Sequence, residues 1–231
     1  MSSKPLRLIS SMATRELLRE LAGLYQRATS HEVLTEAAGG VDVAKRVRAG
    51  EAVDVVVLAS DVIDKLIAEG KLLAGSRVDL VNSGVAIAVR AGAPRPDITT
   101  EQAVKRAVQA AKTLSYSTGP SGVHLEKTFE RWGILAEIRS RVQVPPPGVP
   151  VGSLVASGAA ELGFQQLSEL KNLQGIDVLG PLPREIQTIT TFSGGVSATS
   201  SQPDTAHALL AYMAAPSTTE LKQRLGMDAA A

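Results

Sequence analysis

Several residue types are absent or scarce in this chain of 231 residues, and each absence excludes a class of function. There is no cysteine, which excludes disulfides and thiolate metal sites. Aromatic residues make up only 3%, so stacking platforms for sugars or nucleobases are scarce. The 24 basic residues are scattered among 23 acidic ones, without the clustered basic patch that nucleic-acid binding normally needs. We therefore expect no nucleic-acid partner.

Long apolar runs are also missing. No window approaches the roughly 18 apolar residues of a membrane span, so no span is predicted. The first residues, MSSKPLRLIS, contain a shorter apolar stretch than the roughly 7–15 residues of a secretory signal. From the sequence as given we expect a cytoplasmic protein, or a periplasmic one if a signal peptide has been removed.

The familiar catalytic and nucleotide-binding motifs do not occur. There is no GxGxxG, GxxxxGK[ST], HExxH or GxSxG, and no cluster of histidines typical of a metal cage. We accordingly predict no cofactor and no metal.

The apolar residues that are present, 44% of the chain, suffice for a real core and fall into alternating strand and helix patterns. This alternation predicts an α/β protein with a parallel sheet and helices on both sides. The predicted strands are 6–10, 31–37, 54–60, 83–92, 112–117, 141–144, 161–166, 175–180 and 189–199. The predicted helices are 12–27, 43–49, 61–69, 101–111, 122–133, 151–158, 203–214 and 216–225, and residues 39–42 are predicted as a turn.

These elements form two successive blocks with two long strands between them. The C-terminal helices have few strands of their own, so we assign them to the first block. The prediction is lobe 1 at residues 1–84 plus 193–231 and lobe 2 at residues 85–192. Gly84, Gly194 and Gly195 are candidate pivots in the crossing strands.

Residues 115–125, SYSTGPSGVHL, lead through small residues into an amphipathic helix. One interpretation is a loop and a helix start capped by Ser121. The other is an anion site, because unpaired amides and the helix dipole attract negative charge. The candidate contacts are Ser117 and the amides of Ser121, Gly122 and Val123.

The order of elements resembles a known family. The segments that carry the resemblance are ISSMATRELL, VAKRVRAGEAVDVVVLASD, NSGVAIAVRAG, GPSGVHLEKTFERWGI, GSLVASGAAELGFQQLSEL and FSGGVSA. Together they resemble the type II periplasmic binding protein fold and, more closely, the molybdate-binding proteins of ABC importers. The resemblance implies two lobes, each a mainly parallel sheet flanked by helices, that close on an anion.

In that family neutral donors hold the oxyanion: two serines, backbone amides at helix starts and a tyrosine. The resemblance places Gln166 at the tyrosine position. It places Gly39 or Gly40 at the second serine position, where there is then no hydroxyl. The expected ligand is a small anion, either an oxyanion such as molybdate or a small organic carboxylate, and the changed polar contacts favour the carboxylate. The binding positions implied here are Ser10, Ser11, Met12, Gly39, Gly40, Ser121 and Gly148.

Alternatives remain open for several of these side chains. Ser10 and Ser11 are either ligand donors or helix caps. Gln165 and Gln166 either meet a ligand or satisfy neighbouring backbone groups. His124 is either structural or an acid–base group.

Two functions follow from this reading. The first is a solute-binding protein that closes on a small anion, with an ABC permease as partner if the protein is exported. The alternative is a cytosolic enzyme on the same fold, an isomerase or tautomerase of a small carboxylic acid, with His124 as its candidate catalytic residue.

Overall fold

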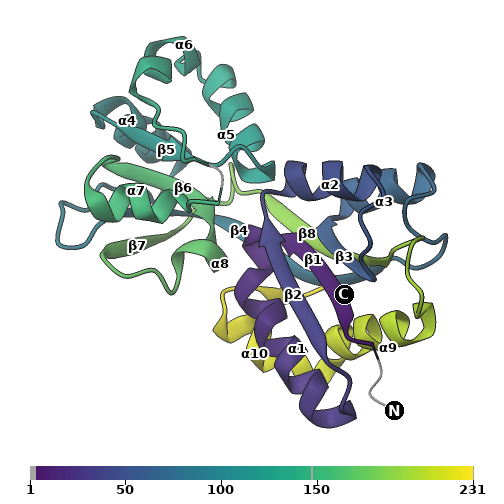
Figure 1. Ribbon diagram of the computed structural model, residues 1–231. Coiled ribbons are helices and arrows are strands. Elements are labelled where there is room, and N and C mark those ends of the chain that lie inside the picture. The colour runs from purple at the N-terminus through teal and green to yellow at the C-terminus, as the bar shows by residue number, and fades with distance from the viewer. Residues whose placement is uncertain (1–3, 147, 231) are drawn as a thin grey trace. The chain divides into compact units, whose positions relative to one another are not determined.

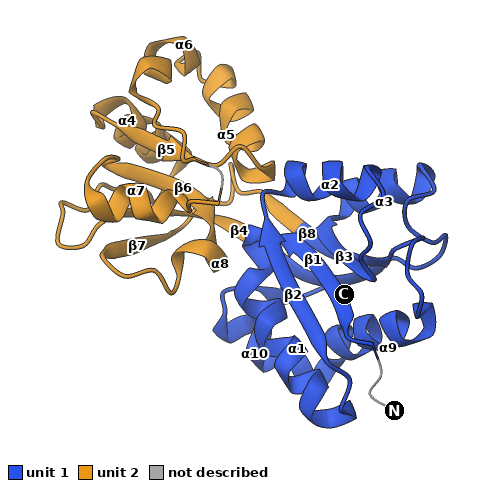
Figure 2. Ribbon diagram, viewed as in Figure 1, with its two compact units in different colours: residues 1–82, 191–231 blue, residues 83–190 orange. Residues whose placement is uncertain are grey.

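The computed structural model describes residues 4–146 and 148–230, and the chain divides into two compact units. Unit 1 comprises residues 1–82 and 191–231, and unit 2 comprises residues 83–190 (Figure 2). The boundaries predicted from the sequence, after residues 84 and 192, lie two residues later in each case. Two strands, β4 (Val78–Arg90) and β8 (Ile189–Val196), carry the chain from one unit into the other.

Unit 1 is a sheet in the order β2-β1-β3-β8 with helices on both faces (Figure 1). Strand β1 is parallel to β2 and β3, whereas β8 is antiparallel to β3, and β9 is antiparallel to the first part of β4. The elements are β1 (Leu6–Ser11), η1 (Met12–Thr14), α1 (Arg15–Thr29), β2 (Val33–Ala38), α2 (Gly40–Arg48), β3 (Val55–Ala59), α3 (Ser60–Ala68), α9 (Pro203–Ala214), η3 (Pro216–Thr218), α10 (Thr219–Arg224) and β9 (Asp228–Ala229).

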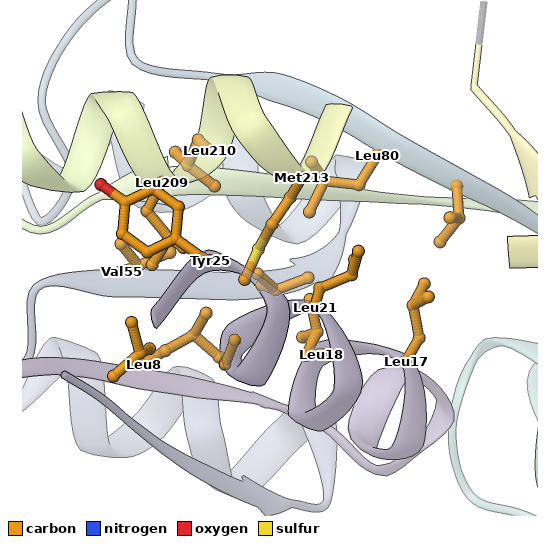
Figure 3. Packing of buried hydrophobic residues seen from close by; sticks show 14 of the residues in the cluster. Leu8, Leu17, Leu18, Leu21, Tyr25, Val55, Leu80, Leu209, Leu210 and Met213 are labelled. Atoms are coloured by element: carbon orange, nitrogen blue, oxygen red, sulfur yellow. The ribbon is translucent and has the colours of Figure 1, made fainter. Parts of the chain in front are cut away.

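The buried strands of unit 1 are apolar on both faces because each face is covered by helices. On β3, Val55 and Val57 pack with α1, α9 and α10, whereas Val56 and Leu58 pack with α2 and α3. Successive side chains of a strand point to opposite faces, so a strand covered on both sides reads as a continuous apolar run. Figure 3 shows the first of these layers, where side chains of α1 and α9 meet those of the sheet.

Unit 2 contains the strand order β4-β6-β5, with β7 paired to the other side of β4. Its helices also lie in two layers, with α4 and α5 on one face of the sheet and α7 and α8 on the other. The elements are α4 (Glu101–Ala110), β5 (Leu114–Tyr116), α5 (Pro120–Arg131), α6 (Leu135–Ile138), η2 (Arg139–Arg141), α7 (Val151–Ser157), β6 (Leu162–Gln166), α8 (Leu167–Leu170) and β7 (Ile176–Pro181).

The sheets are mixed, and the prediction of a mainly parallel sheet in each lobe is wrong for unit 2. There, β5 and β6 are parallel, but β4 is antiparallel to both β6 and β7. Strand β5 is followed by α5, α6 and α7 before β6, and a helical crossover of this kind joins neighbouring parallel strands.

Three local predictions are also corrected. Residues 141–144 form no strand: Val142 makes a single bridge to Leu114, and the prolines that follow have no amide hydrogen for a ladder. The predicted turn at residues 39–42 is instead the start of α2, with Gly39 at the N-cap. Strand β4 begins at Val78, earlier than predicted. Among the described residues, no helix is long and apolar enough to cross a membrane.

Candidate functional site

In unit 1 the carboxyl ends of three neighbouring strands meet the starts of helical segments. Strand β1 ends at Ser11 beside Ala38, the last residue of β2, and η1, α2 and α3 begin directly after β1, β2 and β3. In open α/β sheets ligands bind at this edge, because the helix starts present unpaired amides. The predicted residues Ser10, Ser11, Met12, Gly39 and Gly40 all lie here.

The two serines of this edge have different surroundings. The Ser10 hydroxyl is buried and donates to the Ser11 carbonyl oxygen at 3.3 Å. The Ser11 hydroxyl is also buried, yet it has no hydrogen-bond partner among the described residues. Ser11 occupies the N-cap position of η1 but makes no side-chain capping bond. Capping therefore does not explain Ser11, and its hydroxyl is free to bind a ligand.

Gly40 lies beside Ser11. A Cβ on Gly40 would lie 3.9 Å from the Cβ of Ser11 and 3.7 Å from Leu58 Cδ2, which is ordinary contact. A small side chain would therefore fit the fold here. A Cβ on Gly39 would lie 3.3 Å from a carboxylate oxygen of Asp42, which stands in the first turn of α2 and offsets the positive potential there.

In unit 2 the parallel strands β5 and β6 end side by side, and the sequence STGPSG after β5 opens α5. Gly119 is the N-cap of α5, so the prediction that Ser121 could be the cap is not met. The hydroxyls of Ser117 and Ser121 are hydrogen bonded to each other at 3.0 Å. Gly122 permits this tight turn, because a Cβ there would lie only 1.5 Å from the Ser117 carbonyl oxygen.

The backbone amides at the start of α5 differ in their hydrogen bonding. The Val123 amide donates to the Gly119 carbonyl oxygen at 3.1 Å, so it is already used inside the turn. Within the described part of the chain we find no backbone acceptor for the amides of Ser121 and Gly122. Unlike α2 and α3, α5 has no acidic residue in its first turn, so its positive end is not offset locally.

The tandem glutamines at the end of β6 also differ from each other. Gln165 Oε1 accepts from the Val151 amide at 2.9 Å and Nε2 donates to Glu169 at 2.6 Å, so Gln165 caps α7. Gln166 Nε2 donates to the Thr190 hydroxyl at 3.0 Å, but its Oε1 is buried and has no partner among the described residues. Of the two glutamines, Gln166 is the one with a side-chain atom, Oε1, that is still able to form a hydrogen bond with a ligand.

His124 stands three residues after Ser121 on α5, so the two side chains are neighbours on the helix surface. Its Nε2 lies 2.8 Å from the Ile186 carbonyl oxygen. Since a carbonyl only accepts, Nε2 carries a hydrogen, and Nδ1 is the ring atom that can accept a proton when the ring is neutral. At the end of β5, burial raises the pKa of Tyr116 to about 12, and the nearby Glu126 carboxylate adds to this shift.

The structure also describes the surroundings of three predicted glycines. Gly148 is in a turn at φ +77°, where the Val149 amide donates to the Pro146 carbonyl oxygen. A Cβ on Gly194 or Gly195 would lie within 2.2 Å of Leu210 or 2.8 Å of Leu72, so close packing explains these glycines without a hinge.

Ser83 is a buried polar residue that the sequence analysis missed. It is 1% exposed on β4, and its hydroxyl has no partner among the described residues. Its only signal in the sequence is a small polar residue, in NSGVAIAVR, at the start of an apolar run.

Comparison with known proteins gives the fold class and then the family. The periplasmic molybdate-binding protein of Azotobacter vinelandii superposes with a TM-score of 0.80 at 20% identity, covering 96% of this chain and 98% of that one. Peb3 from Campylobacter jejuni superposes with a TM-score of 0.73 at 15% identity, covering 96% and 99%. At these identities the likeness shows the periplasmic-binding-protein fold.

Residues 6–228 match the model of the bacterial extracellular solute-binding protein family, and the chain belongs to that family. The resemblance predicted from the sequence is thereby confirmed. The chain is also similar to an aconitate isomerase of Pseudomonas sp., with 37% identity over 228 residues, which cover 96% of this chain and 87% of that protein.

Proposed function

We propose that this protein is an isomerase of a small carboxylic acid of the aconitate type, built on a solute-binding fold. The observation that carries the proposal is the 37% identity to an aconitate isomerase across 96% of the chain. This favours the enzyme, which the sequence analysis gave as its alternative, over a plain solute-binding protein.

The donors at the two strand edges support a carboxylate ligand. The free hydroxyl of Ser11 and the backbone amides of Ser121 and Gly122 are neutral donors, and Gln166 adds a neutral amide whose Nε2 donates to Thr190. Fixed dipoles of this kind stabilise negative charge without requiring a salt bridge. That donors from both units meet on one ligand remains a prediction from the resemblance.

The chemistry requires one proton to leave and one to return. Aconitate is a propene with three carboxylates, and its CH₂ group lies next to the double bond. Removing a CH₂ proton gives an allylic carbanion whose charge spreads into the carboxylates. The two C–C bonds of its three-carbon chain then have the same bond order. Returning the proton to the other terminal carbon moves the double bond, and rotation before that step exchanges the cis and trans isomers. Neutral donors that bind the carboxylates more strongly as charge develops would accelerate this step.

His124 is the base that we propose for this proton transfer. Its Nδ1 can accept the proton, while the hydrogen bond from Nε2 to Ile186 fixes the ring and its tautomer. The half-buried ring is next to Ser121 on the helix, so the base and an anion donor lie together within unit 2.

The proposal is tested by adding a hundredth of an equivalent of protein to cis- or trans-aconitate and following the vinyl proton by NMR. We expect conversion of many equivalents. His124→Ala should lower kcat by about 100- to 10,000-fold with little change in ligand affinity. If His124→Ala turns over aconitate at the wild-type rate, His124 is not the base. If the folded wild-type protein shows no turnover, the protein is not an aconitate isomerase.

A second candidate is reversible solute binding without turnover, which the family favours. In that case a carboxylate or an oxyanion such as molybdate raises the melting temperature but is recovered unchanged. A permease partner remains a prediction that belongs to this second candidate. The compartment also remains a prediction, cytoplasmic for the sequence as given or periplasmic if a signal peptide was removed.

A further inference from the structure

Two buried polar atoms in unit 2, Ser83 Oγ and Gln166 Oε1, lack hydrogen-bond partners in the part of the chain that the structure describes. Ser83 on β4 is 1% exposed and Gln166 on β6 is 2% exposed. Neither Ser83 Oγ nor Gln166 Oε1 has a hydrogen-bond partner in the described structure. Unpaired buried polar groups are costly and rare, so each needs an explanation.

The sheet register places both side chains on one face. Val85 lies directly opposite Gln166 in the antiparallel pair of β4 and β6. Directly opposite residues share a face, and so do residues two apart on a strand, so Ser83 lies on the face of Val85 and Gln166. The two are diagonal neighbours, within reach of a long side chain such as glutamine, yet they are not bonded to each other.

The hydrogen-bond capacities of Ser83, Gln166 and Thr190 fit an anion between the first two. As the amide stands, Gln166 Nε2 donates to the Thr190 hydroxyl at 3.0 Å. A half-turn of the amide exchanges its oxygen and nitrogen, and the Thr190 hydroxyl then donates to Oε1. Gln166 Nε2 and Ser83 Oγ would then both direct hydrogens into the space between the two side chains. A carboxylate there could accept a hydrogen bond from each with its two oxygens.

We propose that Ser83 and Gln166 bind one carboxylate of the substrate, and that Thr190 is a positioning residue that orients the Gln166 amide. The proposal rests on the proposed function for the class of ligand, a small polycarboxylate. It adds a recognition site that uses no positive charge and is formed by side chains of β4 and β6.

The test compares Ser83→Ala with Ser115→Ala. Ser115 is buried on β5 in the same unit, but its hydroxyl donates to the Gln143 carbonyl oxygen at 2.7 Å. Titration calorimetry uses trans-aconitate and three dicarboxylates that each lack one of its carboxylates: glutaconate, mesaconate and itaconate. We expect Ser83→Ala to weaken trans-aconitate binding at least tenfold and to leave one of the three dicarboxylates unaffected. Ser115→Ala should lower the melting temperature without this selectivity.

Ligand-free stability gives a second measurement that does not depend on the substrate. Ser83→Ala should melt at or above the wild-type temperature, because it removes a buried hydroxyl that has no partner. If the melting temperature of Ser83→Ala falls as much as that of Ser115→Ala, the Ser83 hydroxyl has a structural partner and the proposal is wrong. Unchanged affinity for every acid would overturn it as well. If wild-type protein binds the acids without isomerising them, the proposed function fails while this site stands.

Thr190 is tested by rescue. Thr190→Val removes the hydroxyl that orients the amide and should weaken binding, and Thr190→Ser should restore it. Equal affinities of the two variants would exclude the positioning role.

Discussion

Replacing Ser11 with alanine separates a ligand-binding hydroxyl from a structural one. The Ser11 side chain is 8% exposed at the start of η1, and its hydroxyl has no partner among the described residues. Ser11→Ala therefore breaks no hydrogen bond within the protein. The free energy of unfolding should stay the same or rise by up to about 1 kcal/mol, since a desolvated and unpaired hydroxyl is removed.

Ligand affinity should respond in the opposite direction. A hydrogen bond from a hydroxyl to a charged group contributes about 1.5–3 kcal/mol. Because 1.4 kcal/mol corresponds to about a tenfold change in Kd, Ser11→Ala should weaken carboxylate binding by about 10- to 100-fold. Titration calorimetry measures Kd, and urea denaturation of the ligand-free protein measures stability.

Thr14→Val is the matched control three residues later. Thr14 is fully buried, and its hydroxyl donates to the Ser11 carbonyl oxygen at 3.1 Å. Valine keeps the shape and loses this bond, so stability should fall by about 1 kcal/mol while Kd changes little. If Ser11→Ala binds with wild-type Kd, or is destabilised as Thr14→Val is, Ser11 is not a ligand donor.

Three further predictions concern stability. Gly122→Ala would bring a Cβ to 1.5 Å from the Ser117 carbonyl oxygen, so it should lose about 3 kcal/mol or more in urea denaturation; near-wild-type stability would refute the tight turn. Gln165→Ala removes the cap of α7 and should cost about 1–2 kcal/mol, whereas no loss would mean that the cap contributes nothing. The Arg77 hydrogen bond lowers the pKa of Asp79, so the stabilisation by ionised Asp79 is present above the unfolded-state pKa and is lost as pH falls through the folded-state pKa. Asp79→Asn should therefore flatten the pH dependence of stability below about pH 4, and an unchanged pH profile would contradict this role of Asp79.

The sequence predicted most of the elements because their patterns are local. The apolar run of β3 and the amphipathic pattern of α1 each depend on a few neighbouring residues, and both elements lie within two or three residues of the predicted limits. The strand predicted at residues 141–144 does not form, because a tetrapeptide with two valines does not reveal whether it finds a partner strand. Here the prolines that follow leave room for a single bridge at Val142.

The candidate site could be predicted only in outline. The sequence located the serines at the end of β1 and after β5 because small polar residues before a helix are a local signal. It could not distinguish Gln165 from Gln166, since one turns toward α7 and the other toward Thr190 only through strand pairing. Ser83 was missed for a related reason, because its lack of a partner depends on the register of β4 and β6.

Equilibration from both isomers tests the central claim, that this solute-binding fold is an isomerase, most directly. A trace of purified protein is added to separate solutions of pure cis- and pure trans-aconitate, and the two vinyl signals are followed by NMR to constancy. We predict that both solutions reach the same ratio after many turnovers per protein molecule. If both isomers persist unchanged while the acid raises the melting temperature of the same preparation, the protein binds a carboxylate but does not isomerise it.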